Sequence, residues 1–270
     1  MVKSISSPVN PLIKNIILLT DKSKYRKETG TFVVEGKKEI LMALQADYIP
    51  KTFVFNPTIV SYNQLLDLYG NILFDTEIIE VTNLVYDKIA YREGTEGVIA
   101  IFNAQEHTLS SIKFNSPNPL ILIAEAPEKP GNIGALLRTA DAGGVDMFII
   151  ANPNTDIYNP NIIRSSIGSV FSNKVVTGTN SEIISFLKLN KIKIFCAVIN
   201  ENSVSCYTQN FTGPLAIVVG TESEGLSSEW LQASDTNIII PMKGQIDSVN
   251  VSVSAAILIF EAVRQRNNQT

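Results

Sequence analysis

Residues 120–151 read LILIAEAPEKPGNIGALLRTADAGGVDMFIIA, and the expected fold follows from this stretch. An apolar run at Leu120–Ala124 comes first, a helical pattern follows at Ile133–Ala142, and a second apolar run occupies Val145–Ala151. Neither run alternates polar and apolar residues, so both faces of each strand should be covered. A strand, a helix and a strand in this order predict a mostly parallel sheet with helices on both faces.

The alternation of strands and helices continues towards the C-terminus. Further strands are expected at Lys193–Ile199, Leu215–Val219 and Asn237–Ile240, and helices at Asn161–Phe171, Ser181–Leu189, Ser227–Ala233 and from about Asn250 to Arg266. Ligands of such sheets usually bind outside the carboxyl ends of the strands, so the loops after the strands are candidate sites. The last helix is apolar over more than one face, which is typical of a helix at a subunit interface or inside the molecule.

Upstream, a smaller α/β pattern covers about a hundred residues. Its strands are expected at Phe32–Val34, Lys51–Phe55, Glu77–Val81 and Gly97–Phe102, and its helices at Glu35–Ala46 and Thr82–Ala90. A polar stretch that ends in two prolines separates the two patterns. At 270 residues the chain exceeds the prior of about 150 residues for one domain. We therefore expect an N-terminal domain at 1–104, a linker at 105–118 and a C-terminal domain at 119–270.

The composition excludes several classes of protein. Apolar residues make up 45% of the chain and charged residues 18%, against a typical charged fraction of about 25%, so a disordered chain is excluded. No apolar run approaches the roughly 20 residues that span a bilayer, and MVKSISSPVN at the N-terminus has no signal-peptide core. We expect a cytoplasmic protein without a membrane partner. The net charge of −4 gives no indication of nucleic-acid binding.

Metal-binding and redox residues are scarce. The chain contains two cysteines, Cys196 and Cys206, and a single histidine, His107. These are too few for a zinc cluster, a disulfide framework or a multi-histidine metal site, and one histidine weakens any serine-hydrolase triad. We expect no metal.

The first candidate segment, Glu125–Gly144, follows a predicted strand and is rich in small residues. Gly131 and Gly134 let the backbone approach a ligand closely, and Arg138 projects from the new helix. A tight turn with a solvated arginine explains the segment about equally well. The fingerprint G-x-G-x-x-G is absent, which argues against a nucleotide-dependent oxidoreductase on the same class of sheet.

The second candidate segment, Val219–Ser227, carries Glu222 and Glu224 at a strand end. Two carboxylates admit glycosidase chemistry, but nothing in the sequence sets their separation. The simpler interpretation is a turn at Glu224-Gly225 with Ser227 as the cap of the next helix.

The third candidate segment, Ile238–Asn250, is a strand that runs into a proline and a polar loop. Ser248 and Asn250 precede the apolar last helix, and either could simply cap it. Taken alone, none of the three segments identifies a reaction.

Together the segments resemble the SpoU (TrmH-like) family of RNA ribose 2'-O-methyltransferases in the SPOUT superfamily. The matching motifs are 132–143 (NIGALLRTADAG), 158–169 (YNPNIIRSSIGS), 220–227 (GTESEGLS), 240–244 (IPMKG) and 247–253 (DSVNVSV). The N-terminal motifs 32–41 (FVVEGKKEIL) and 94–100 (GTEGVIA) resemble the ribosomal-protein-like RNA-binding domain that often precedes this catalytic domain. Glu96 departs from that pattern, because relatives often carry glutamine there.

The resemblance implies a fold and a cofactor. The C-terminal domain would form a trefoil knot whose main chain makes a cleft for S-adenosylmethionine (AdoMet), with the active site at a homodimer interface. The implied AdoMet-binding residues are Val219, Gly220, Glu222, Ile240, Met242, Gly244, Ser248, Val249 and Asn250. The implied catalytic residues are Asn132, Arg138, Glu222, Ser248 and Asn250.

The resemblance also assigns roles to charged residues. Arg138 would act at the ribose 2'-hydroxyl. Because a guanidinium essentially never deprotonates in proteins, we expect it to bind the adjacent phosphate and stabilise alkoxide charge rather than act as a base. Glu222 would orient an arginine, and Arg164 with Ser165 would contact RNA phosphates.

RNA binding depends heavily on phosphate neutralisation, and the basic residues are unevenly placed. They crowd the N-terminal stretch at Lys14, Lys22, Lys24, Arg26, Lys27, Lys37 and Lys38. We expect Lys24, Arg26 and Lys27 to contact RNA, although a solvated surface would have the same composition. Ribosomal RNA is the expected substrate. A transfer-RNA 2'-O-methyltransferase and a non-catalytic RNA-binding relative are the alternatives.

Overall fold

The computed structural model describes residues 2–91, 96–109, 112, 114, 116–221 and 223–268. This part of the chain divides into two compact units. Unit 1 comprises Met1–Glu106 and Asp156–Ser172, and unit 2 comprises His107–Thr155 and Asn173–Thr270. Segment 156–172 therefore belongs to unit 1 although it lies in the C-terminal half of the sequence, an assignment that was not predicted from the sequence.

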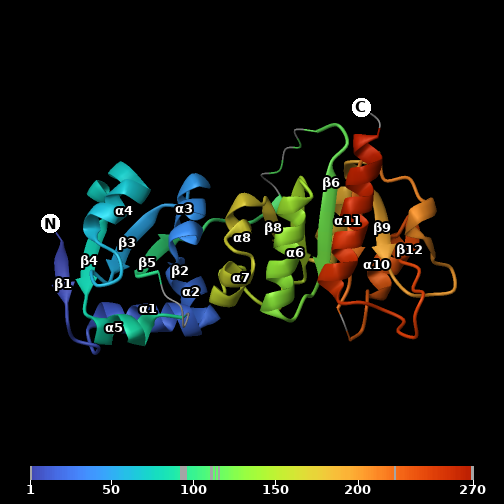
Figure 1. Ribbon diagram of the computed structural model, residues 1–270. Coiled ribbons are helices and arrows are strands. Elements are labelled where there is room, and N and C mark those ends of the chain that lie inside the picture. The colour runs from blue at the N-terminus through green and yellow to red at the C-terminus, as the bar shows by residue number, and fades with distance from the viewer. Residues whose placement is uncertain are drawn as a thin grey trace. The chain divides into compact units, whose positions relative to one another are not determined.

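Unit 1 contains, within the described residues, a five-stranded mixed sheet in the order β1-β4-β3-β5-β2 (Figure 1). The strands are β1 (Lys3–Ile5), β2 (Thr31–Glu35), β3 (Pro50–Phe55), β4 (Glu77–Val81) and β5 (Val98–Asn103). β4 is parallel to β1 and β3, whereas β5 runs antiparallel to β2 and β3. Every predicted strand of this region is present, and β1 was missed because three residues are too short to show a period.

The helices of unit 1 cover both faces of its sheet. Between the strands lie α1 (Pro11–Asp21), α2 (Ser23–Thr29), α3 (Lys37–Gln45), α4 (Tyr62–Tyr69), the short 3-10 helix η1 (Gly70–Asp75) and α5 (Asn83–Ile89). Ile16 of α1 and Tyr86 of α5 pack with Val33 and Val54 in one buried cluster. α3 packs beside β2 and β5, with α4 next to it. Of these helices, α1, α2 and α4 were not predicted from the sequence.

Segment 156–172 forms two short helices, α7 (Pro160–Ser165) and α8 (Ser169–Ser172). The prediction of one continuous helix at Asn161–Phe171 was wrong, because Ile167 and Gly168 adopt positive φ angles of 54° and 80° between the two helices. A Cβ on Gly168 would lie 2.8 Å from Sδ of Met42 in α3, so close packing inside unit 1 also requires glycine here.

Unit 2 is built, in the described residues, on a seven-stranded sheet in the order β10-β12-β9-β11-β6-β7-β8. The strands are β6 (Leu120–Glu125), β7 (Met147–Ala151), β8 (Val175–Gly178), β9 (Lys193–Ala197), β10 (Val204–Ser205), β11 (Leu215–Val219) and β12 (Thr236–Ile239). All six pairings are parallel, which confirms the predicted parallel α/β architecture. β8 and β10 were not predicted.

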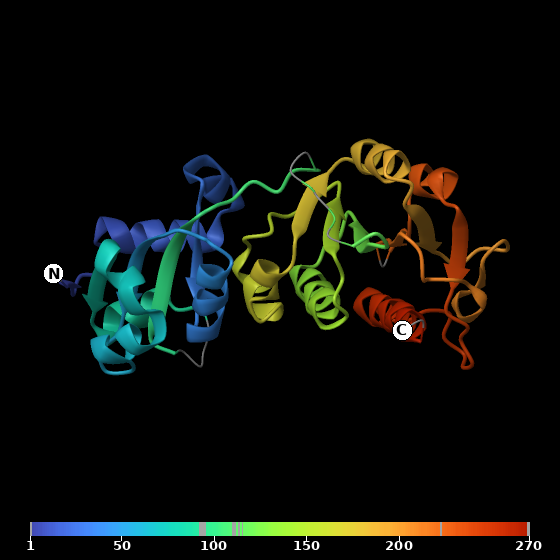
Figure 2. The same cartoon turned by 90° about the horizontal axis from the view of Figure 1, so that it is seen from above.

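Helices cover both faces of this sheet, as Figure 2 shows. α6 (Pro130–Ala142) and α11 (Val251–Asn267) pack together on one face, and α9 (Asn180–Leu189) and α10 (Ser228–Ala233) pack together on the other; a 3-10 helix, η3 (Cys206–Thr208), follows β10. Gly143 permits the close approach of the first pair, since a Cβ there would lie 2.4 Å from Cγ2 of Ile259. Among the described helices, none combines the length and apolar character needed to cross a bilayer.

Candidate functional site

The candidate site lies where neighbouring parallel strands of unit 2 end. β6 and β11 pair in register, with Ala124 opposite Val219. The loops that follow these two strands therefore leave the sheet side by side at its carboxyl edge. One loop leads into α6 and carries Asn132, and the other begins at Gly220.

A small cavity of about 80 Å³, partly open to solvent, lies between these loops. Its described lining consists of Ala124, Pro127, Glu128, Lys129, Asn132, Leu136, Gly220, Thr221, Ser223 and Val251. Residues from three distant parts of the sequence therefore share one cleft, called the cleft below.

Gly220 is required by the backbone of the second loop. A Cβ at Gly220 would lie 2.2 Å from the carbonyl carbon of Gly225, because the loop folds back on itself. Thr221 N donates to Gly225 O at 3.0 Å, and Gly225 N donates to Thr221 O at 3.2 Å. Gly225 has a φ of 71°, which glycine adopts without strain. The predicted turn at Gly225 is present, and Ser227 is the N-cap residue of α10.

Ala126 begins the first loop with a φ of 42°, a left-handed conformation that residues with a Cβ seldom adopt. Its N–H donates to Ala151 O at 2.8 Å, which holds the chain as it turns out of β6. Backbone strain of this kind clusters at ligand-binding sites.

Asn132 and Arg138 both lie on α6, but they face different directions. Asn132 is half-buried and lines the cleft. Arg138 lies six residues further on, which is about 120° around the helix at 3.6 residues per turn. It is exposed, does not line the cleft, and forms no ion pair within the described residues. One chain therefore does not bring Arg138 to the cleft.

Asn250 connects the third segment to the first. Its Oδ1 accepts from Ser252 N at 2.9 Å, so Asn250 is the N-cap of α11, and its Nδ2 donates to Asn132 Oδ1 at 3.4 Å. Ser248 does not cap the helix; its exposed hydroxyl donates to Asp247 Oδ1 at 3.1 Å. The structure thus brings Asn250 to Asn132 and leaves Ser248 in the loop.

The remaining predicted cofactor residues follow the ends of β11 and β12. Val219 is buried in β11, Ile240, Met242 and Val249 are half-buried, and Gly244 is exposed. None of these five is part of the described lining of the cleft. Glu222, predicted for both catalysis and cofactor binding, lies outside the described residues, as do Gly94 and Thr95 of the N-terminal motif.

Several lining residues were not singled out from the sequence, among them Lys129, Thr221, Ser223 and Val251. Lys129 precedes Pro130, the first residue of α6, and a proline at that position is a recognisable helix-start signal. Thr221 and Ser223 flank Glu222 in the second motif. Val251 had no signal, because an apolar residue at a helix start is expected to face the core.

Two predicted RNA contacts, Arg164 and Ser165, lie on α7 in unit 1. Arg164 is exposed and lines a small pocket of about 20 Å³ together with Glu35 and Tyr91. The hydroxyl of Ser165 donates to Asn161 O at 2.5 Å, so it satisfies a helix carbonyl. On α2, Lys24 and Lys27 are exposed, and Lys24 lies 3.8 Å from the carboxylate of Glu28.

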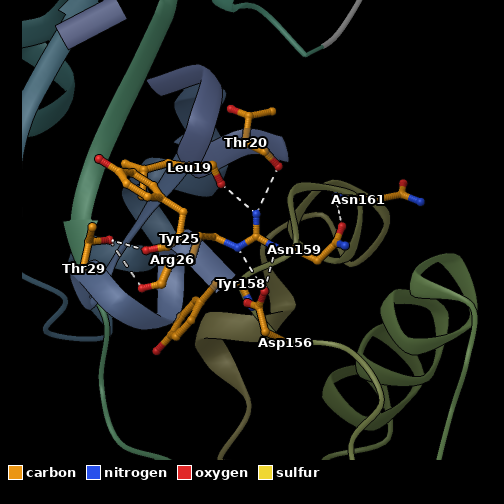
Figure 3. A network of polar contacts seen from close by, with 9 residues as sticks. All are labelled: Leu19, Thr20, Tyr25, Arg26, Thr29, Asp156, Tyr158, Asn159 and Asn161. Atoms are coloured by element: carbon orange, nitrogen blue, oxygen red, sulfur yellow. Dashed lines mark hydrogen bonds and ion pairs between the residues drawn. The ribbon is translucent and has the colours of Figure 1, made fainter. Parts of the chain in front are cut away.

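Arg26 corrects the sequence interpretation. It is 4% exposed, and its guanidinium donates to Asp156 Oδ2 from Nη2 at 2.6 Å and from Nε at 3.0 Å (Figure 3). Nη1 donates to the carbonyls of Leu19 and Thr20 at 2.7 and 3.0 Å. The side chain is therefore committed to protein partners inside unit 1 and does not offer a surface charge to RNA.

No cluster of three potential metal-ligating side chains occurs in the part of the chain that the structure describes. The two cysteines are buried and free, and burial raises the pKa of the Cys196 thiol to about 11. The cleft is instead lined by the apolar residues Ala124, Pro127, Leu136 and Val251 together with amide, hydroxyl and charged groups, which suits an organic ligand with polar ends.

The fold and the cleft define an α/β protein with a candidate ligand site at the carboxyl edge of a parallel sheet. The SpoU rRNA Methylase family matches residues 119–260, and the MRM3-like substrate binding domain matches residues 10–100. The chain belongs to the SpoU rRNA Methylase family.

Known relatives resemble this chain over two thirds of its length or more. The 23S rRNA (guanosine(2553)-2'-O)-methyltransferase RlmP of Bacillus subtilis is 28% identical over 96% of this chain and 98% of its own. The 23S rRNA (guanosine-2'-O-)-methyltransferase RlmB of Haemophilus influenzae is 34% identical over 69% of this chain and 78% of its own. Among solved structures, an RNA 2'-O ribose methyltransferase has a TM-score of 0.84 at 37% identity, covering 98% of this chain and 99% of its own. An AdoMet-bound rRNA methyltransferase from Sinorhizobium meliloti has a TM-score of 0.88 at 28% identity, covering 97% and 98%.

Proposed function

We propose that this protein transfers a methyl group from AdoMet to the 2'-hydroxyl of a ribose in ribosomal RNA. The observation that carries the proposal is the cleft, where Asn132, Gly220 and Val251 meet at the carboxyl edge of the unit 2 sheet. Its loops are the motif segments of the SpoU family, and the relatives named above are 23S rRNA 2'-O-methyltransferases. A ribosomal RNA substrate implies a cytoplasmic enzyme.

The cleft suits AdoMet in its donor set and backbone. Gly220 has no side chain to cover the main chain of the second loop. The lining also offers hydroxyl and amide groups at Thr221, Ser223 and Asn132. When bound, AdoMet supplies an electrophilic methyl group on a sulfonium. Val219, Ile240, Met242, Gly244, Ser248 and Val249 do not line the cleft, so they remain proposed contacts only to a part of this cofactor that extends beyond the described lining, together with Glu222.

Arg138 contributes to the reaction through its charge. A ribose hydroxyl becomes nucleophilic as it loses its proton, and a guanidinium can stabilise the oxygen as negative charge develops. The fork of Arg138 can also bind the adjacent phosphate and so orient the ribose. Positioning of this kind contributes about 7–11 kcal/mol in well-oriented systems.

Arg138 faces away from the cleft of its own chain, so we infer that the site is completed by a second copy. α11 presents exposed apolar side chains at Val253 and Phe260, 46% and 49% exposed, with half-buried Ile257 between them. These positions share one face of the helix and would form a self-complementary dimer contact. Sedimentation should find a dimer in the wild type and a monomer in V253E/F260E. A wild-type monomer at micromolar concentration would contradict this inference.

The trefoil knot is likewise a proposal. α11 follows β12 in the sequence but packs on α6 and on β11. In the sheet, β11 is separated from β12 by β9. The chain therefore returns across the sheet after β12, as threading requires. A backbone trace from an experimental structure tests the crossing.

The RNA footprint is assigned to unit 1. Lys24 and Lys27 of α2 are exposed there, and Arg164 lies on α7 of the same unit. We propose these three residues as phosphate contacts, with Ser165 in a supporting role and Arg26 removed from the set.

The decisive experiment incubates the protein with ribosomal RNA and transfer RNA of its host and with methyl-labelled AdoMet. We expect label on one ribose of ribosomal RNA, where the 2'-O-methyl group makes the adjacent phosphodiester resistant to alkali. Label on transfer RNA alone would overturn the ribosomal assignment. Label on neither RNA would favour the non-catalytic relative.

A further inference from the structure

A buried carboxylate lies directly behind the cleft and takes no part in the site described above. Glu125, the last residue of β6, is 6% exposed. Its Oε1 accepts from Asn180 Nδ2 at 2.7 Å, and its Oε2 accepts from the backbone N–H of Ser227 at 2.8 Å. Asn180 is 4% exposed, and its Oδ1 accepts from Nε1 of the fully buried Trp230 at 2.9 Å. We call these residues the Glu125 network.

Donor counting sets the direction of every bond in the Glu125 network. The indole N–H of Trp230 can only donate, so it requires the oxygen of the Asn180 amide. The amide nitrogen of Asn180 must then face Glu125, which also receives the N–H of Ser227. Two donors therefore converge on residue 125. An ionised carboxylate meets each donor with a different oxygen, whereas a glutamine in the same place has one oxygen and an NH2 group, so one of the two donors would face another donor.

The Glu125 network holds the second loop of the cleft from behind. Ser227 is the N-cap residue of α10, and the loop that ends there begins at Gly220 and contributes Gly220, Thr221 and Ser223 to the lining. Ala124, the neighbour of Glu125 in β6, lines the cleft as well. The same carboxylate therefore connects the end of β6, the start of α9 and the far end of this loop.

We propose that Glu125 is a positioning residue for AdoMet binding, because it fixes Ser227 at the end of the loop that contributes Gly220, Thr221 and Ser223 to the cleft. The inference rests on the proposed placement of AdoMet in the cleft. Glu125 does not line the cleft and acts on the ligand only through the loop.

The test compares E125Q with the double variant E125Q/N180D. In E125Q, the glutamine NH2 must face either Asn180 Nδ2 or Ser227 N–H, so one buried donor lacks an acceptor. In the double variant, the new carboxylate at position 180 accepts from both Trp230 and the glutamine NH2, and the glutamine oxygen accepts from Ser227. The donors of Trp230 and Ser227 are again paired, and the negative charge has moved from position 125 to position 180.

D146N is a matched control. Asp146 Oδ2 accepts from Leu120 N at 2.8 Å at the opposite end of β6, so it is also a carboxylate on a backbone amide, but it lies away from the cleft. Each variant is titrated with AdoMet by calorimetry, its melting temperature is measured, and hydrogen exchange of the Ser227 amide is followed without ligand.

We expect E125Q to weaken AdoMet binding about tenfold, as one unmet buried donor would, and to speed exchange at Ser227. E125Q/N180D should restore both properties, and D146N should leave AdoMet affinity unchanged. A lower melting temperature in E125Q with unchanged AdoMet affinity would overturn the inference, as would a double variant that regains stability without affinity. A wild type that binds no AdoMet would overturn the proposed function as well.

Discussion

Arg26 and Asp156 form a buried ion pair between residues that lie 130 positions apart in the sequence, 4% and 8% exposed at their side chains. Both residues belong to unit 1, and the pair ties segment 156–172 to α2. Beside it, Tyr158 stacks on Phe32 with ring centroids 4.0 Å apart. Segment 156–172, which carries Arg164, is therefore anchored by an ion pair and by aromatic contacts of Tyr158 and Phe171 with Phe32 and Tyr48.

Breaking the Arg26–Asp156 pair should destabilise unit 1. R26A leaves a buried carboxylate unpaired, and we expect the free energy of unfolding to fall by about 3–5 kcal/mol in denaturant titrations. R26M/D156L replaces both partners by apolar groups and should recover most of that stability. Equal stability of R26A and the wild type would show that the pair does not form in solution.

Arg138 should be required for turnover and not for AdoMet binding. We expect R138A to reduce the single-turnover rate about 10²–10³-fold, the range for removing one preorganised donor, with AdoMet affinity unchanged. R138K should stay at least about tenfold below the wild type, because an ammonium lacks the planar fork. K188A, on α9, is the control. Wild-type turnover in R138A would remove the residue from the site.

Mixing variants tests whether Arg138 acts on the partner's cleft. In an equal mixture of R138A and N132A, half of the dimers are mixed, and each mixed dimer contains one site with both wild-type groups if Arg138 acts across the interface. Activity should then recover to about a quarter of the wild-type value. No recovery in dimers that exchange subunits would place Arg138 and Asn132 of the same chain in one site.

Asn250 has two roles that substitution can separate. N250D keeps the cap on α11 but removes the amide that donates to Asn132, so it should retain stability and lose activity. N250A should remove the cap as well and destabilise the protein by about 1 kcal/mol. Thermal melts report the cap and methyl transfer reports the amide. Full activity in N250D would leave Asn250 with a capping role only.

Exposed lysines of α2 should set the salt dependence of RNA binding. K24E/K27E should weaken binding and make the slope of log K against log salt shallower by about 0.7–0.9 for each phosphate that is no longer neutralised. K51E/K188E reverses two exposed lysines outside the proposed surface and controls for net charge. Equal slopes in the two double variants would contradict the assignment of RNA binding to α2.

His107 should make the protein less stable as the pH falls. Burial lowers its pKa, and the hydrogen bond with Val175 O opposes this only in part. The unfolded chain therefore takes up a proton near pH 6.5 that the folded protein takes up only at lower pH, so stability is lost as the pH falls below 6.5. His107 contributes at most about 1.4 kcal/mol per pH unit to the slope of the unfolding free energy against pH. In H107Q this part of the slope between about pH 7 and 5 should disappear, since the chain has one histidine; an unchanged slope would assign it to other groups.

Local signals predicted much of unit 2 correctly. β11 was predicted to the residue because Leu215–Val219 is a continuous apolar run, and a strand buried on both faces needs such a run. Helix boundaries differ in how local their signals are. The start of α9 has a local signal, the capping box of Thr179 and Glu182. The boundaries of α7 and α8 depend instead on the packing of Gly168 against Met42. A contact between residues so far apart in sequence leaves no periodic signal.

The amino-acid sequence by itself determined the class of sheet, the two loops that line the cleft and the family, because each depends on neighbouring residues or on motif order. Only the tertiary structure decided which charged residues are available. Arg26 and Lys27 are adjacent in a basic run, yet Arg26 is buried against Asp156 and Lys27 is exposed. Glu125 showed no signal at all, since its role depends on Asn180 and Ser227, which reach it only after the strands and helices have packed. The physical reason is that burial and hydrogen-bond partners are set by contacts between distant segments.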